Sequence, residues 1–456
     1  MSKRLLIAWL GASLVAVVCL SPATAPAMEP HVDCREPFVF DGADVNVVAL
    51  PYRSAGEAAT PVREIGQRLA LLIKLDVLSH ILEYGSIGAV QMEVPNGVRD
   101  DAPCRPELVI PQLLGQRGGA RTQVAKGHGV IFVWGILYEE QQDIVVQSYA
   151  RFLRRDSSET IALNAGGLEF RMQPDSGTVA FSPQLLSKKL LDAVAASYSK
   201  ADFVRTEARD DAPGEPLPRP IAKCFNCGDV APTAFQVDEK KGEWIHVRWL
   251  DPRSLDTHAG WIHAAGGLSG QSLHSILPEL SFVEGTVGYL RQRVAVQRGE
   301  HLPKALAALT ERSFESFQQA SEMARTPTTA GIGRQLGGVV QLLQDDGERL
   351  VRAHRDFDGA LAFAPYSANA MTLAAVTQIA AEWNQGHSLS SERMLADRLT
   401  AAAMLSDDSA GALNNLWNFY KLLQMRTTIG AEQQLSPAEV AQRLHDVDLI
   451  RTPPAL

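Results

Sequence analysis

The chain has 456 residues, 46% of them hydrophobic and 21% charged, which is typical of a soluble globular protein with several domains. Its formal net charge is −9. An acidic chain without a basic run argues against nucleic acid as a partner and against electrostatic docking on anionic lipid.

The first 27 residues have the pattern of a signal peptide. Lys3 and Arg4 precede the apolar run Leu5–Leu20, and Ala25 and Ala27 form a small-residue cleavage site. The run is too short to span a bilayer. We therefore expect cleavage near Ala27 and a periplasmic or secreted protein. A lipoprotein signal at Cys19 is disfavoured, because the two valines before it are not the small residues that such processing prefers.

Removal of residues 1–27 takes away two basic and no acidic residues, so the mature charge is 41 minus 52, or −11. The mature chain keeps Cys34, Cys104, Cys224 and Cys227. An even number of cysteines in an oxidising compartment predicts two disulfides. Cys34–Cys104 and Cys224–Cys227 are the simplest pairs, although four cysteines allow three connectivities.

Residues 28–205 are predicted to form an α/β domain with a mixed sheet. Strand and helix patterns alternate along it. The first half is expected to contain a strand at 45–52, a helix at 61–84, a strand at 87–94 and a helix at 106–116. The hairpin of 129–138 with 143–151 follows, then strands in 160–172 and 178–181 and a helix at 183–199. The strand ending Val48-Ala49-Leu50-Pro51-Tyr52 and the segment Trp134–Tyr138 resemble the amino-terminal domain of TolB and of curli-secretion lipoproteins. That resemblance implies a binding and assembly module without catalytic residues. A proline-rich linker follows at 206–222.

Residues 223–270 are predicted to be a small all-β module. Trp244–Trp249 alternates between two faces, and a second short strand begins at Gly260. These motifs resemble the bacterial Src-homology-3-like domain, a small β-barrel of envelope proteins that commonly binds peptides or cell-wall material. The resemblance implies a binding position at Trp244, with His246 and Arg248 as its neighbours on the same face, whereas Trp249 and Trp261 are expected in the core.

Cys224 and Cys227 open this module, and three interpretations compete. The exported location favours a structural disulfide. A thiol-redox pair would need a helix after the cysteines, which Gly228-Asp229 and Pro232 do not favour. A zinc site could recruit His258 and His263, but no second pair of closely spaced cysteines exists.

Residues 271–456 are predicted to be α-helical throughout. The segments 362–368 and 404–410 each end one amphipathic helix and begin the next. They resemble the inter-helix turn of the tetratricopeptide repeat, at an offset of 42 residues (410 minus 368). Such an array would offer a concave face to a peptide or protein, and a plain helix bundle is the alternative.

The overall prediction is a multidomain α+β protein: an exported, non-enzymatic binding or scaffold protein of the bacterial envelope. Its expected partners are an envelope protein or peptide and peptidoglycan, and no cofactor, metal or catalytic residue is predicted. Two alternatives remain: a cell-wall hydrolase targeted by the barrel, and a thiol-redox protein that uses the cysteine pair. Neither a metalloprotease nor a serine-hydrolase motif occurs in the sequence.

Overall fold

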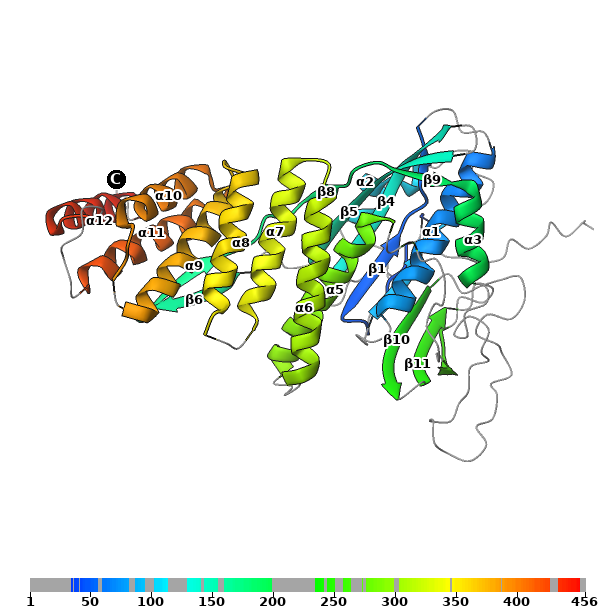
Figure 1. Cartoon of the computed structure of the whole chain (residues 1–456), viewed down its shortest axis with the longest axis horizontal. Coiled ribbons are helices and arrows are strands. Elements are labelled where there is room, and N and C mark those ends of the chain that lie inside the picture. Colours follow the sequence, from blue (N-terminus) through cyan, green and yellow to red (C-terminus); the bar gives the residue numbers. More distant parts are fainter. Residues whose placement is uncertain are drawn as a thin grey trace, which may run out of the picture.

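The structure is a computed structural model of mixed α and β architecture, with a large sheet at one end and a row of helices at the other (Figure 1). It describes residues 34–35, 37–40, 42–55, 60–81, 87–94, 102–113, 129–140, 143–154, 160–198, 234–241, 244–250, 257–263, 273, 276–298, 303–344, 347–386, 388–426 and 434–451. The predicted signal peptide, the proline-rich linker at 206–222, Cys224 and Cys227 lie outside these ranges.

The sheet has ten strands in the order β12-β11-β10-β3-β1-β4-β5-β8, with β2 and β9 paired to β4 and β5. Three parallel strands form its centre, namely β1 (Val45–Ala49), β3 (Ile87–Gln91) and β4 (Gly129–Glu140). All residues of β1 and β3 are buried, as expected for parallel strands covered on both faces. The mixed α/β sheet predicted from the sequence is confirmed.

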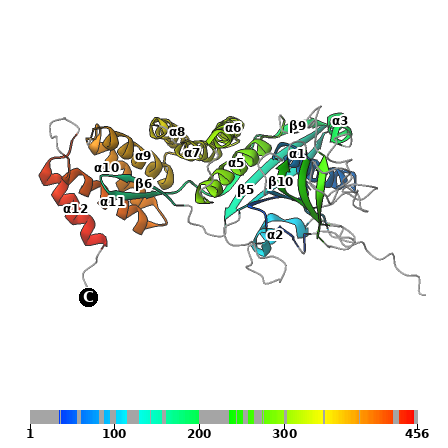
Figure 2. The same ribbon diagram turned by 90° about the horizontal axis from the view of Figure 1, so that it is seen from below.

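Helices cover both faces of this sheet (Figure 2). On one face lies α1 (Thr60–Ile81), whose Leu69, Ile73 and Val77 are buried against β1. On the other lies α2 (Pro106–Leu113), which follows a short 3-10 turn, η1 (Ala102–Cys104). Each helix connects two parallel strands, so the sheet separates two apolar cores.

Antiparallel strands complete the sheet on the β4 side. These are β5 (Asp143–Arg154), β8 (Thr178–Ala180) and β9 (Gln184–Ser187), while β2 (Arg53–Ser54) pairs with β4 in parallel. The helix predicted at 183–199 is wrong at its start, because residues 184–187 pair with β5 as β9 and α3 (Lys188–Tyr198) begins only afterwards.

The central module adds three antiparallel strands to the other edge. They are β10 (Ala234–Lys241), β11 (Trp244–Leu250) and β12 (Thr257–His263). β10 pairs with β3, for example Phe235 opposite Ala89, so the module continues the large sheet. No closed barrel forms among the described residues, and the predicted Src-homology-3-like barrel is not confirmed.

The C-terminal region is helical, as predicted. Its helices are α5 (Pro278–Arg298), α6 (Pro303–Glu322), α7 (Pro327–Leu342), α8 (Arg349–Phe363), α9 (Ala368–Gly386), α10 (Glu392–Leu405), α11 (Ser409–Gln424) and α12 (Pro437–Arg451). From α6 onward each helix packs on the next, and Figure 1 shows them as one row. The predicted turns at 362–368 and 404–410 join α8 to α9 and α10 to α11.

The helical row, called the array below (α6–α12), is joined to the sheet without a break in packing. Arg325 N–H donates to the carbonyl of Ala180 at 3.0 Å, and Ser182 N–H donates to the carbonyl of Met323 at 3.0 Å. The turn between α6 and α7 is thereby bonded to the chain around β8. One apolar cluster extends from Val45 in β1 to Val447 in α12.

Candidate functional site

One face of the array carries a β-hairpin supplied by the front half of the chain. The hairpin consists of β6 (Ile161–Ala165) and β7 (Leu168–Met172), and it lies along α9 and α11 (Figures 1 and 2). Gly166 and Gly167 form its two-residue turn with φ angles of +60° and +77°, which glycine adopts without steric cost.

Side-chain alternation gives the hairpin an apolar and a polar face. Ala165, Phe170 and Met172 are buried, whereas Asn164 and Arg171 are exposed. An apolar face directed at the helices is what a two-stranded hairpin needs for stability, since it cannot bury enough surface alone. The array therefore already holds an extended segment of polypeptide.

Two asparagines of α11 bond the backbone of β7. The Asn415 amide accepts from Arg171 N–H at 2.9 Å and donates to the Arg171 carbonyl, and Asn418 donates to the Glu169 carbonyl at 2.8 Å. Asn415 is 2% exposed and Asn418 5% exposed. Because these bonds reach main-chain atoms, they recognise an extended backbone and not a particular side chain.

Asp175, just after β7, fixes the position of the segment that leaves the hairpin. Its N–H donates to Gln335 Oε1 at 2.7 Å, and Gln335 Nε2 donates back to Asp175 Oδ2 at 2.7 Å. Ser367 Oγ and Asn369 Nδ2 also donate to the carboxylate, at 2.6 and 3.0 Å. One carboxylate thus connects the hairpin with α7 and with the turn between α8 and α9.

Two grooves lie beside the hairpin. A polar one of about 280 Å³ lies at the start of α9 and α11 and is lined by Arg171, Asn369, Thr372, Asp408 and Asn415 among others. A second, of about 300 Å³, separates β6 from α7 and is mainly apolar, with Val339 and Leu342 in its wall.

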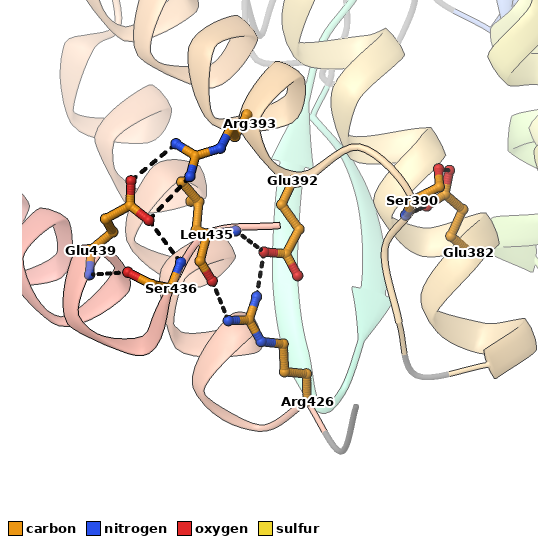
Figure 3. Close-up of polar contacts among 8 residues, drawn as sticks. All are labelled: Glu382, Ser390, Glu392, Arg393, Arg426, Leu435, Ser436 and Glu439. Atoms are coloured by element: carbon orange, nitrogen blue, oxygen red, sulfur yellow. Dashed lines mark hydrogen bonds and ion pairs between the residues drawn. The ribbon is translucent and has the colours of Figure 1, made fainter. Parts of the chain in front are cut away.

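The last helix closes the array through a buried ion pair (Figure 3). Arg426, two residues after α11, donates to the carboxylate of Glu392 and to the carbonyl of Leu435, and Leu435 N–H donates to Glu392 Oε2 at 2.7 Å. Glu392 is 0% exposed. The pair fixes the chain entering α12, on which Ala438 and Gln442 are exposed.

Exposed contacts add to this closure. Arg393 donates two bonds to Glu439, at 3.0 and 3.2 Å, and Ser436 and Glu439 bond each other's backbone N–H as a capping box. The Arg393 and Ser436 donors hold the pKa of Glu439 down to about 2. The carboxylate therefore stays ionised at neutral pH.

The binding position predicted at Trp244, His246 and Arg248 lies on β11, at the far end of the molecule from the array. The predicted alternation is confirmed, because Ile245, Val247 and Trp249 are buried on the opposite face. Trp261 is also buried, as predicted, but it lies opposite His246 and therefore on the face of the predicted binding position.

Asp238 of β10 contacts two of the side chains on this face of β11, called the second face below. Its Oδ2 lies 3.1 Å from His246 Nδ1 and accepts from Arg248 Nε at 2.9 Å. The Trp261 ring packs 5.1 Å from the His246 ring, and Lys241 Nζ lies 4.9 Å from the Trp261 centroid. Two of the predicted residues, His246 and Arg248, therefore share an acidic partner, and His246 also packs on an aromatic ring. Binding at this face remains a prediction.

Of the predicted disulfides, one falls on described residues. Cys34 and Cys104 are bonded and buried beneath β1 and β3. Cys224 and Cys227 lie outside the described residues, as does the side chain of His263, so the second disulfide and its zinc alternative remain predictions. In the described part of the chain, no three His, Cys, Asp or Glu side chains form a set that could hold a metal ion.

Ionisable side chains also gather in the core between the sheet and α5. Tyr52 Oη and Ser148 Oγ both donate to Glu279 Oε1, at 2.8 and 2.6 Å. Burial raises the pKa of Glu279, an effect that the Ser148 bond opposes, and burial together with the nearby Glu279 raises the pKa of Tyr52. All three side chains are buried, so the cluster holds α5 against the sheet.

Comparison with protein-family models, curated proteins and solved structures found no match for this chain. Among the helices that the structure describes, none has both the length and the apolar composition needed to cross a bilayer.

Sequence reasoning did not identify the asparagines, Asp175 or the Glu392–Arg426 pair. The spacing of Asn415 and Asn418, three residues apart on one helix, places both on one face, and this was the available signal. The partners of these residues lie more than 240 positions earlier in the chain, at Arg171 and Glu169.

Proposed function

We propose that the chain is an exported, non-enzymatic scaffold protein of the bacterial envelope, whose array holds polypeptide segments on its α7, α9 and α11 face. One observation carries this proposal: Asn415 and Asn418 bond main-chain groups of a strand that lies on the array. A surface that recognises extended backbone in one segment has the chemistry to recognise it in a partner.

The rest of the architecture supports the same interpretation. Stacked helices that end at α12 offer a long surface, and the Glu392–Arg426 pair keeps its last layer in place. The second face, with Trp244, His246 and Arg248 beside Trp261, would add a contact for an acidic or aromatic ligand, such as a peptide or peptidoglycan. Cleavage near Ala27 and the disulfide of Cys34 with Cys104 are consistent with an oxidising compartment.

The test is site-specific photocrosslinking in cells that express the whole chain. The photoreactive residue p-benzoylphenylalanine would replace Leu343, which borders the apolar groove, or Ala438, which is exposed on the outer side of α12. We expect a discrete protein crosslinked from position 343 and none from position 438. Equal labelling at both positions, or none at either, would contradict the proposal.

A cell-wall hydrolase targeted by the β10–β12 module is the alternative. Purified protein that releases soluble fragments from isolated peptidoglycan would favour it, provided that the activity stays with the chain through purification. A thiol-redox protein would instead reduce insulin disulfides and would lose that activity with Cys224→Ser.

A further inference from the structure

One edge of the β6–β7 hairpin is bonded and the other is open. In a two-residue hairpin, Ala165 and Leu168 exchange hydrogen bonds next to the turn, and so do the pairs two and four residues further along. The residues between them point their N–H and C=O groups outward. On β7 these are Glu169 and Arg171, whose outward groups bond the asparagines of α11.

On β6 the corresponding residues are Ala162 and Asn164. Both side chains are exposed, and β6 pairs with β7 alone among the strands that the structure describes. Their outward N–H and C=O groups are therefore a template for another strand. The two edges differ because α11 supplies amide side chains along β7, whereas a groove lies along β6.

That groove has an apolar wall and a positive charge. Val339 and Leu342 of α7, with Leu343 directly after it, form the wall opposite Ile161 and Leu163. The described residues that line it also include Arg293 of α5 and Arg349 of α8, and none of the described lining residues is acidic. The groove thus combines an open strand edge, an apolar surface and two cationic side chains.

We propose that an extended peptide segment binds here as a third strand on the free edge of β6, with apolar side chains in the groove and acidic side chains near Arg293 and Arg349. Only a backbone in the extended conformation supplies alternating N–H and C=O groups at the required spacing. The contacted stretch, Ile161–Leu163 with Asn164, corresponds to an added strand of about four or five residues. This inference rests on the proposed function and specifies the partner of the scaffold as an extended peptide with acidic and apolar side chains.

A second copy of the chain fits this edge less well. An isologous pair of β6 edges would bring the two arginines of one copy close to those of the other. Like charges at a strand pairing are destabilising, whereas an acidic peptide neutralises them. Charge complementarity therefore favours the acidic peptide.

The experiment selects binders from a random nine-residue peptide library displayed on phage, with residues 28–456 as the target. We expect enriched sequences with alternating apolar residues and at least one flanking Asp or Glu. The most enriched peptide would then be synthesised and its Kd measured against the wild type and against variants at the edge.

Ala162→Pro removes one outward N–H and places a ring on the free edge, and proline is tolerated at edge strands. We expect it to weaken peptide binding at least tenfold. Ala162→Val keeps the N–H and should change the Kd by less than about threefold, because it alters only an exposed side chain.

Arg349→Gln tests the charge of the groove. It should weaken peptide binding severalfold and reduce the dependence of binding on salt concentration. Circular dichroism and the Tm of each variant would establish that it is folded.

Two results would overturn the inference: no enriched peptide, or an enriched peptide whose Kd does not change with Ala162→Pro. Self-association that Ala162→Pro abolishes would assign the edge to a second copy. If the photocrosslink from position 343 persists in the Ala162→Pro variant, the scaffold function stands and only the strand-addition site fails.

Discussion

Asn415 holds both backbone groups of Arg171, accepting from its N–H at 2.9 Å and donating to its carbonyl. The two residues are separated by 244 positions in sequence. The amide therefore makes the array and the front half of the chain depend on each other. It also makes the hydrogen bonds that a neighbouring strand would otherwise make with the outer edge of β7.

Replacement of Asn415 by Leu should release β7 from α11. The variant would remove the two hydrogen bonds that the N–H and carbonyl of Arg171 make at a partly buried position, which costs about 2 kcal/mol of unfolding free energy. Urea unfolding measures the loss, and hydrogen exchange should show faster exchange at residues 168–172. Asn414→Ser is the matched control on the next position, where the side chain bonds only the exposed Arg451 among described residues. Equal effects of both variants would contradict a special role for Asn415.

The buried ion pair between Glu392 and Arg426 should be far more sensitive to single than to double replacement. Arg426→Met leaves a buried carboxylate without its cation and should cost about 3 kcal/mol or more. The double variant Glu392→Leu with Arg426→Met removes both charges and should recover much of that loss.

The exposed pair of Arg393 and Glu439 provides the control for this comparison. Arg393→Gln breaks a solvent-exposed contact and should shift the urea midpoint much less than Arg426→Met does. Urea unfolding of the four proteins, with hydrogen exchange in α12, gives the ranking. A double variant as unstable as Arg426→Met would show that the pair acts through shape and not through charge.

Removal of the disulfide between Cys34 and Cys104 should destabilise the α2 side of the sheet. The two cysteines are 70 positions apart, and a closed loop of that length corresponds to about 4 kcal/mol in the chain-entropy model. Unfolding of Cys34→Ser with Cys104→Ser, compared with the oxidised wild type, measures the difference. Disulfide mapping by mass spectrometry should recover the linked pair, and a peptide that joins Cys34 to Cys224 would refute this connectivity.

The sequence allowed the local elements to be predicted well, because their signals are local. The apolar run of β1, the alternation of Trp244–Trp249 and the stripe of α1 each report burial through their pattern. The start of α3 was missed because residues 184–187 have helical character but pair with β5. Tertiary pairing decided that conformation over local propensity.

Long-range pairing could not be predicted in the same way. The sequence separates residues 223–270 as a module, yet β10 pairs with β3, more than 140 positions earlier. No local pattern specifies which strand meets a free edge. The asparagine contacts on the hairpin were hidden for the same reason, because an asparagine on a helix has no distinctive pattern until its partner strand is in place.

The lysine buried on α1 should make stability depend on pH above neutrality. Lys74 is 2% exposed, and burial lowers its pKa from 10.5 to about 7, although Glu93 opposes the shift. Below pH 7 the lysine is charged in both the folded and the unfolded state, so the full free-energy cost of burying the charge opposes folding. Between about pH 7 and 10.5 the folded state has released the proton while the unfolded state keeps it, so the unfolding free energy rises with pH. The rise should be about 2 kcal/mol between pH 7 and pH 9.

Lys74→Met removes the group, so it should raise stability at pH 7 and flatten this rise. Lys189→Met, at an exposed position of α3, should do neither. Urea unfolding at pH 7, 8 and 9 measures all three proteins, and a wild type with no rise in this range would show that Lys74 keeps its charge when folded.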